Sequence, residues 1–384
     1  HMENEGLTLN EKVFCSKHKG TTYLSEPHSA EDKFYLNFTS NDFLDFNRND
    51  VIAKAAKEAV DSHGAGLSSV RFICGTQDIH KNLEKKLAEF HHQDDCILYP
   101  SGYNANTALF EAILGENDAI ICDEANHGSI IDGTRLCKAK RYLYKHLDLT
   151  DLELNLQKAK SDGADLMLVV TQSSFSNTSD LAPLKEIGHI CHEAHAMLAI
   201  DDCCGVGLIG AHLRGTPEFF GVMDKVHIIN GSFSNALGGG GGGYTVGMHE
   251  VIDLLRQKAR PYLFSNTLSP PSVAVASTAL DLLTHSREQI TRLYKHTSYF
   301  RSKMREAGFT VFGSELPTCP VFIGNHWVAQ DVAGDLKDRG ILVKALYAPY
   351  VPNNKAIIRV NMNAAHTEKD VKYFVDSFIQ VGKE

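Results

Sequence analysis

Hydrophobic residues occur along most of the chain as short continuous runs, and amphipathic segments separate these runs. Such runs predict β-strands that are buried on both faces, while the amphipathic segments predict crossover helices. The alternation is typical of an α/β domain built on a mainly parallel sheet, here with seven strands. The predicted strands are 95–99, 119–122, 140–144, 166–171, 197–201, 226–230 and 244–248. Amphipathic helices are predicted at 79–91 and 181–195.

A second pattern begins near Pro270, where a long apolar helix is predicted at 273–285. Strands are then expected at 310–312, 321–323, 342–346 and 356–361, and a final helix at 367–381. This order predicts a small α+β domain after a large α/β domain. We therefore expect a polar N-terminal arm (1–45), a large domain (46–270) and a small C-terminal domain (271–384).

The charge and cysteine content argue against several classes of protein. The formal net charge is −9 with both signs interspersed, which argues against a nucleic-acid surface. Hydrophobic residues make up 43% of the chain, but no apolar run is as long as a membrane span. The nine cysteines include no CxxC pair, so we expect reduced thiols, no metal site and a cytoplasmic protein. His1-Met2 resembles a cloning remnant, and no signal peptide follows it.

Four segments, taken together, resemble one enzyme family. They are 69–80 (SVRFICGTQDIH), 126–133 (NHGSIIDG), 260–266 (RPYLFSN) and 358–366 (IRVNMNAAH). Their order and spacing are similar to those of the α-oxoamine synthases, and most closely to the 2-amino-3-ketobutyrate CoA ligase (glycine C-acetyltransferase) group. The resemblance covers the chain from about Asn41 onward. It implies a pyridoxal phosphate (PLP) fold of type I, a homodimer with active sites at the subunit interface, and condensation of an amino acid with an acyl-CoA.

The resemblance also implies roles for individual residues. The implied cofactor-binding residues are Gly102, Tyr103, His127, Ser176, Asp201, Ser232 and Thr267. In the family, His127 matches a histidine that stacks on the pyridine ring, and Asp201 matches the carboxylate that pairs with the ring nitrogen. Thr267 matches a hydroxyl that the neighbouring subunit donates to the phosphate. The substrate carboxylate is expected at Arg359, beside Asn41.

The residues themselves support part of this assignment and leave alternatives open. Ser101 is expected to open a helix after a strand, where N–H groups and the helix dipole favour an anion. The same segment is also typical of an ordinary capped helix. Asp201 ends a parallel strand, where ligands bind in such sheets, and its alternative is a turn or cap residue. His127 is otherwise a solvated loop histidine, and Arg359 is otherwise paired with a structural carboxylate.

Two positions depart from the family pattern. In the segment 228–239 (IINGSFSNALGG), Asn235 stands where the family has the lysine that forms a Schiff base with PLP. A carboxamide cannot form an imine, and no lysine lies between Lys225 and Lys258. Three residues after Asp201, Cys204 replaces a histidine that contacts the cofactor, and a thiol is a weak hydrogen-bond donor.

These departures leave three interpretations. In the first, the chain is an acyltransferase that handles an acyl thioester (acyl-CoA or acyl carrier) and an amino-acid-like acceptor, with PLP held non-covalently or absent. In the second, it is a pseudoenzyme subunit that forms a heterodimer with a lysine-bearing homologue. In the third, Cys204 and His127 perform PLP-independent thioester chemistry. The candidate catalytic residues are therefore Asn235, His127 and Cys204.

Overall fold

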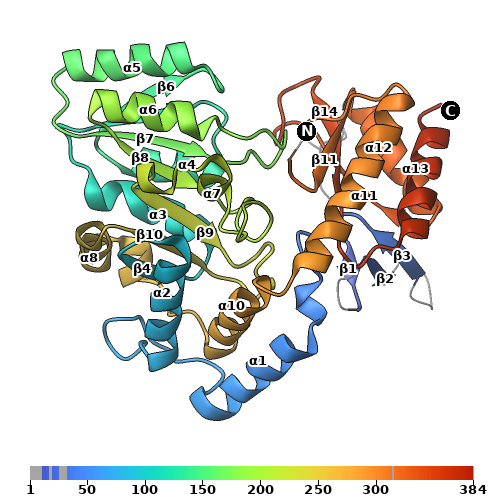
Figure 1. The fold of residues 1–384 in the computed structure, drawn as a ribbon, viewed down its shortest axis with the longest axis horizontal. Helices are drawn as coiled ribbons and strands as arrows, with labels where there is room; N and C mark the ends of the chain where they lie inside the picture. The colour runs from blue at the N-terminus through green and yellow to red at the C-terminus, as the bar shows by residue number, and fades with distance from the viewer. Residues whose placement is uncertain (1–10, 17–19, 26–32, 314, 384) are drawn as a thin grey trace. The chain divides into compact units, whose positions relative to one another are not determined.

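The computed structural model describes residues 11–16, 20–25, 33–313 and 315–383. The chain is divided into two compact units, and neither is continuous in sequence. The larger unit comprises residues 50–175 and 181–285, and the smaller unit comprises residues 1–49, 176–180 and 286–384. Figure 1 identifies their helices and strands.

A seven-stranded sheet forms the centre of the larger unit (Figure 1). Its strands are β4 (Asp95–Tyr99), β5 (Ala119–Asp123), β6 (Lys140–Tyr144), β7 (Met167–Gln172), β8 (Met197–Asp201), β9 (Ile228–Ser232) and β10 (Gly243–Gly247). Their spatial order is β4-β10-β9-β8-β7-β5-β6, and β10 alone runs antiparallel to its neighbours. Because β5, β7, β8 and β9 are parallel, their carboxyl ends meet at one edge, where ligands bind in such sheets.

Helices cover both faces of this sheet. They are α1 (Asp50–His63), α2 (Asp78–His91), α3 (Gly102–Ile113), α4 (Gly128–Leu136), α5 (Leu149–Ser161), α6 (Leu184–Ala194), α7 (Thr216–Phe220), α8 (His249–Lys258), α9 (Arg260–Leu263) and α10 (Pro270–Leu283), with the 3₁₀ turn η2 (Met223–Lys225). Helices α5 and α6 pack together on one face, and α3 packs with α4 on the other (Figure 1).

The sheet is buried because its strands are nearly continuous apolar runs. Every residue of β5 and β7 is buried. Helix α3 is unusual because residues 105–110 are all buried, so most of its circumference lies inside the protein. A polar side chain within such a helix, as at Asn106, requires hydrogen-bond partners.

The smaller unit contains two sheets. The first has the order β1-β2-β3-β12, and the second has the order β11-β14-β13. Their strands are β1 (Val13–Phe14), β2 (Thr21–Ser25), β3 (Lys33–Asn37), β11 (Thr318–Gly324), β12 (Ile341–Leu342), β13 (Lys344–Leu346) and β14 (Ala356–Asn361). The helices are η1 (Phe46–Arg48), α11 (Arg287–Glu306), α12 (His326–Asp338) and α13 (Glu368–Val381). Strand β3 pairs in parallel with β12, so distant parts of the chain share one sheet.

The predicted seven-stranded, mainly parallel sheet is confirmed, whereas other expectations need correction. The expected polar arm instead contains the strands β1, β2 and β3. Buried Tyr35 lies where β3 pairs with β2, and buried Leu36 lies where β3 pairs with β12. Residues 1–10 of the expected arm lie outside the described residues. Helix α10 belongs to the larger unit, which therefore ends at His285 rather than at 270. The expected strand 310–312 reduces to one bridge between Val311 and Val321.

Two further properties follow from the described residues. All nine cysteines lie among them, and each is a thiol rather than half of a disulfide. None of the helices formed by these residues has the combination of length and apolar composition that a bilayer crossing requires.

Candidate active site

Asp201 is the last residue of β8, at the carboxyl edge of the large sheet. Its side chain is buried, with 5% of the residue surface exposed. The Nδ2 amide of Asn106 donates to Oδ2 at 2.7 Å, and the backbone N–H of Cys203 donates to Oδ1 at 3.0 Å. Each carboxylate oxygen has more than one lone pair. Asp201 can therefore accept a further hydrogen bond from a cationic group.

His127 lies on the loop after β5 and is the N-cap residue of α4. The backbone N–H of Ser129 donates to its Nδ1 at 3.3 Å, and the Ser129 hydroxyl lies 2.7 Å from the same nitrogen. These contacts fix the ring at its Nδ1 side, while the residue remains exposed. Asn106 also donates to the Ser129 hydroxyl at 2.9 Å. One amide therefore connects Asp201 to the residue that holds His127.

The start of α3 forms a compact turn after β4. Ser101 caps the helix by accepting the N–H of Asn104 at 3.0 Å. The first N–H groups of a helix have no partner within it, so Gly102 and Tyr103 carry donors suited to an anion. A Cβ atom on Gly102 would lie 3.0 Å from the Cβ of Ser232. A Cβ on Gly243 would lie 2.5 Å from the Gly102 nitrogen. Only glycine at 243 leaves room for this turn.

Asn235 lies beside the segment that follows β8. Its Nδ2 donates to the Cys203 carbonyl at 2.6 Å and lies 3.9 Å from the Cys204 sulfur. The Asn235 side chain and the Asp201 carboxylate therefore both bind the backbone of Cys203, since Asp201 accepts the Cys203 N–H. Burial raises the pKa of the Cys203 thiol well above its usual range, with Asp201 contributing to the rise. Cys203 is consequently a neutral thiol rather than a nucleophilic thiolate.

Asp202, in the same segment after β8, accepts hydrogen bonds from two neighbouring parts of the larger unit. The Ser173 hydroxyl donates to its Oδ1 at 2.5 Å, the Thr216 N–H donates to Oδ2 at 2.9 Å, and the Thr216 hydroxyl donates to Oδ1. Burial raises the pKa of the Asp202 carboxyl to about 7, against the lowering effect of these donors. Asp202 is fully enclosed, so it holds the segment and has no surface for a ligand.

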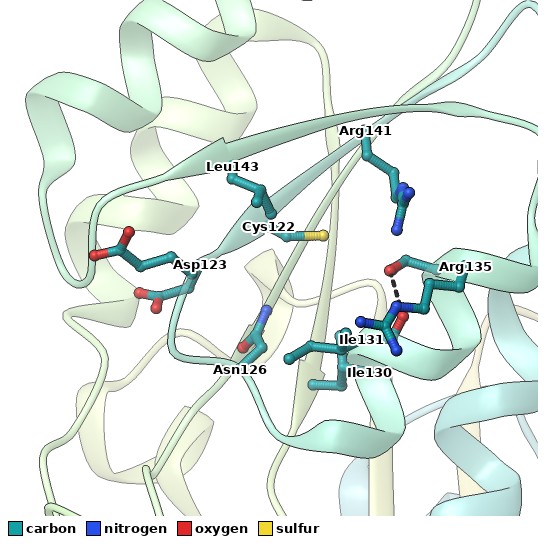
Figure 2. A pocket seen from close by; sticks show the side chains of 10 residues that line it. Cys122, Asp123, Asn126, Ile130, Ile131, Arg135, Arg141 and Leu143 are labelled. Atoms are coloured by element: carbon teal, nitrogen blue, oxygen red, sulfur yellow. Dashed lines mark hydrogen bonds between the residues drawn. The ribbon is translucent and has the colours of Figure 1, made fainter. Parts of the chain in front are cut away.

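A second feature of the larger unit is a pocket of about 450 Å³ beside α4 (Figure 2). Arg135 from α4 and Arg141 from β6 lie at the same side of this pocket, above Ile130 and Ile131. Arg135 donates to Asp132 at 3.2 Å. Among the described residues, no hydrogen bond or ion pair involves the guanidinium of Arg141. The pocket therefore has an apolar floor with two guanidinium groups at one side, while the acidic residues Asp123 and Glu124 also line it, with Asp123 at the other side.

Several other predicted site residues are described within their own units. The Thr267 hydroxyl lies 3.3 Å from His80 Nε2, and its N–H donates to the Ser69 carbonyl at 3.1 Å. Ser176, Asn41 and Arg359 belong to the smaller unit. There Arg359 donates to the Asn41 amide oxygen at 3.3 Å. The roles of these residues remain predictions.

One group of potential metal ligands occurs among the described residues. Ligand atoms of Asp95, His249 and Asp253 lie within 4.8 Å of one another. The Arg256 guanidinium donates to Asp95 at 2.6 Å and to Asp253 at 3.0 Å. Because this cation is already paired with both carboxylates, we assign no metal to the group.

Comparisons with known proteins agree with the fold and with the expected family. A model of the family described as aminotransferase class I and II matches residues 33–378. The chain is 49% identical over 348 residues to the mitochondrial 2-amino-3-ketobutyrate coenzyme A ligase of Homo sapiens, covering 91% of this chain and 83% of that protein. It is 43% identical over 381 residues to the 2-amino-3-ketobutyrate coenzyme A ligase of Escherichia coli K12, covering 99% and 94%.

Further similarities extend to a related synthase and to solved structures. The chain is 40% identical over 390 residues to 8-amino-7-oxononanoate synthase of Fervidobacterium nodosum, covering 100% of this chain and 96% of that protein. Serine palmitoyltransferase of Sphingomonas wittichii has a TM-score of 0.88 and 27% identity, covering 91% of this chain and 88% of that chain. A structure described as SPT with PLP has a TM-score of 0.91 and 25% identity, covering 97% and 92%. The predicted fold class, PLP fold type I, is confirmed.

Proposed function

Because the chain belongs to the aminotransferase class I and II family, we propose that it is an acyltransferase of the α-oxoamine synthase type. It takes an acyl group from acyl-CoA and joins it to the α-carbon of an amino acid, with PLP as cofactor. The observation that carries this proposal is one connected set of contacts at the sheet edge. Through Asn106, Ser129 and Cys203, this set joins Asp201 to both His127 and Asn235.

The residues at this edge fit PLP in charge and in space. The first turn of α3 offers N–H donors for a phosphate, next to the Ser232 side chain. Asp201 offers an oxygen to a protonated ring nitrogen. The exposed imidazole of His127 offers a flat surface to an aromatic ring. When bound, PLP supplies an electron sink for charge at the α-carbon of an amino acid.

The pocket beside α4 supports an acyl-CoA as the donor. Coenzyme A carries phosphate groups at one end and its thioester at the other. Arg135 and Arg141 supply positive charge, and Ile130 and Ile131 supply an apolar surface. Arg135 lies eight residues after His127 on the same helix, and a helix rises about 1.5 Å per residue. The extended pantetheine arm of coenzyme A is long enough for that separation.

Asn235 limits the rate that this arrangement can reach. Its amide holds the Cys203 carbonyl, but it supplies neither an amine for covalent attachment nor a base for the α-proton. We infer that PLP is held by non-covalent contacts and that turnover is slow. Losing a group that acts both as a nucleophile and as a base lowers rates by about 10³-fold or more.

The test is Asn235→Lys, assayed with PLP, glycine and acetyl-CoA by chromatographic detection of released CoA. The variant should gain a visible absorbance band from bound PLP and should turn over about 10³-fold faster than the parent chain. Ser234→Lys is the matched control, because it adds the same amine at an exposed neighbouring position. If Asn235→Lys binds no PLP and releases no CoA with any acyl-CoA offered, the proposed function is wrong.

The other two interpretations remain predictions, and the same experiment separates them. A pseudoenzyme subunit would stay inactive alone and gain activity when mixed with a lysine-bearing homologue. Thioester chemistry at Cys204 would give an acylated protein mass without PLP, and Cys204→Ala would remove it. Acyl transfer that depends on PLP and leaves the protein mass unchanged argues against both.

A further inference from the structure

Asn106 is a buried amide at the centre of the candidate site, with 2% of its surface exposed. It lies on α3 among buried apolar residues, and all its hydrogen-bonding atoms have partners. Its Nδ2 group donates to Asp201 Oδ2 at 2.7 Å and to Ser129 Oγ at 2.9 Å. Its Oδ1 accepts from Asn230 Nδ2 at 2.8 Å.

The neighbouring contacts fix the orientation of this amide. Thr245 Oγ1 donates to Asn230 Oδ1 at 2.6 Å, so the Asn230 amide directs its N–H group at Asn106. If the Asn106 amide were reversed, its oxygen would face the Asp201 carboxylate and its N–H group would face another N–H group. Both contacts are repulsive in a buried site. The sequence of donors therefore runs in one direction, from Thr245 to Asp201.

The same direction continues to His127. Ser129 Oγ accepts the second N–H of Asn106, so its own proton is free to point at His127 Nδ1, 2.7 Å away. The Ser129 backbone N–H, which can only donate, also points at Nδ1 at 3.3 Å. With two donors directed at Nδ1, the ring proton of the neutral imidazole lies on Nε2.

We propose that Asn106 is a positioning residue that orients the Asp201 carboxylate and, through Ser129, sets the tautomer of His127. It holds the carboxylate by donating to Oδ2, and through Ser129 it keeps the proton of the neutral His127 ring on Nε2. A neutral ring can lie against a cationic pyridinium without charge repulsion, and an ionised carboxylate can pair with that cation. This use of the arrangement rests on the proposed function, whereas the arrangement itself does not.

The first test uses the protein without added cofactor. Nitrogen NMR of protein labelled at histidine, with His127→Gln to assign the signal, reports which ring nitrogen carries the proton. The parent chain should give the Nε2-protonated form for His127. In Asn106→Asp a carboxylate replaces the donor, so the Ser129 hydroxyl turns toward that carboxylate and His127 should become a mixture of tautomers. Asn155→Asp makes the same chemical change on α5 and should leave the signal unchanged.

Ser129→Ala provides a second variant in case Asn106→Asp fails to fold. It removes the hydroxyl that reaches His127 but leaves the Asn106–Asp201 contact, so the tautomer ratio should change while the protein stays folded. Finding the parent His127 protonated on Nδ1 would overturn the proposal. It would also be overturned if neither Ser129→Ala nor a folded Asn106→Asp changed the His127 signal.

A second measurement separates this inference from the proposed function. Titration with PLP, followed by absorbance, should show at least about tenfold weaker binding to Asn106→Asp, because the charged ring nitrogen loses an ordered anionic partner. Ser129→Ala should bind PLP more tightly than Asn106→Asp does. If the parent chain binds no PLP but the NMR results hold, the proposed function fails and the positioning role of Asn106 stands. Equal binding by all three chains, with PLP bound, would contradict the role assigned at Asp201.

Discussion

Asp42 is a carboxyl group that the smaller unit buries, with 5% of its surface exposed. The N–H of Phe46 donates to Oδ1 at 2.9 Å, and the N–H of Asn47 donates to Oδ2 at 3.3 Å. Burial outweighs these donors and raises the pKa of Asp42 from 3.8 to about 6. A raised carboxyl pKa contributes stability below about pH 3.8, and this contribution is lost as the pH rises through about 6.

Asp42→Asn should therefore change how stability depends on pH. The two-unit difference in pKa corresponds to about 3 kcal/mol, less about 1 kcal/mol for the weakened contact with the Asn47 N–H. The variant should be more stable than the parent near pH 7 and no more stable near pH 4. Urea unfolding followed by the fluorescence of Trp327, the single tryptophan and a residue of the same unit, measures this difference. A difference that stays constant between these pH values would contradict the assignment.

A substitution at Arg141 tests whether the pocket beside α4 binds CoA. Arg141→Gln should weaken the binding of CoA by about tenfold, because a charge-assisted contact with a phosphate is lost. Calorimetric titration of the parent and variant with CoA measures this directly. Lys140→Gln is the matched control, because this substitution removes the same charge from the same strand. The Lys140 side chain points to the opposite face of the sheet from Arg141, where it pairs with Asp162. Equal affinity in all three chains would remove CoA from this pocket.

Single residues differed in how well the sequence indicated their roles. Asp201 was predictable because a buried apolar run ends at a carboxylate. Asn106 was missed because a polar residue within a helix normally suggests a solvent-facing side. Its signal was present in the helical spacing: Asn104 and Glu111 mark the polar side of α3, whereas Asn106 lies one turn before the buried Phe110. Arg141 was missed because an exposed arginine on a strand is common and indicates no site by itself.

At the scale of elements, Phe38 shows how β3 is held in the smaller unit. It is fully buried, and its ring stacks on those of His366 and Phe374 with centroids 4.1 Å and 4.0 Å away. Its N–H donates to Leu342, and its carbonyl accepts from Asn361. The residue therefore joins the two sheets of that unit through its backbone and packs on α13 through its ring.

Phe38→Ala should destabilise the smaller unit by about 3–5 kcal/mol, as expected for the loss of a buried aromatic ring. Phe34→Ala is the matched control on β3, the strand that directly precedes Phe38, since Phe34 is 53% exposed and should change stability by less than about 1 kcal/mol. The urea midpoint reported by Trp327 fluorescence measures both. Similar midpoints for the two variants would mean that β3 is not integrated into the unit.

The bounds of a strand were predicted most closely where an apolar run is followed directly by a turn residue. The observed bounds of β4, β6, β8 and β14 match the predicted ones. The antiparallel direction of β10 could not be predicted, because an apolar run gives burial and carries no information on direction. The N-terminal strands β1, β2 and β3 pair with one another locally, but β3 also pairs with β12, about three hundred residues away, and no local pattern indicates that partner.

At the scale of the whole molecule, an exposed apolar cluster on the larger unit predicts self-association. Phe72, Ile73 and Phe264 are 62%, 71% and 68% exposed. The segments that carry them are adjacent, because Val70 and Asn266 form a β-bridge. Exposed apolar clusters of this kind commonly mark protein interfaces. Thr267, predicted to serve a neighbouring subunit, follows directly after Asn266.

The pair of substitutions Phe72→Asp and Ile73→Asp should convert a homodimer into a monomer at micromolar concentration, because charges would be buried without partners. Size-exclusion chromatography with light scattering measures the mass of each species. Leu154→Asp provides a control at an isolated exposed apolar position on α5. A parent chain that is monomeric at every concentration tested would contradict the predicted dimer.

The pairing of β3 with β12 also has a consequence for synthesis on the ribosome. The larger unit has all its residues once position 285 has emerged, and compact units of a growing chain generally fold in that order. The smaller unit cannot close its first sheet until residues 341 and 342 are made. While the intervening chain is translated, β3 therefore lacks its partner β12, and apolar side chains such as those of Tyr35 and Leu36 stay exposed to solvent. Nascent chains stalled between 285 and 341 should be the stage most dependent on chaperones.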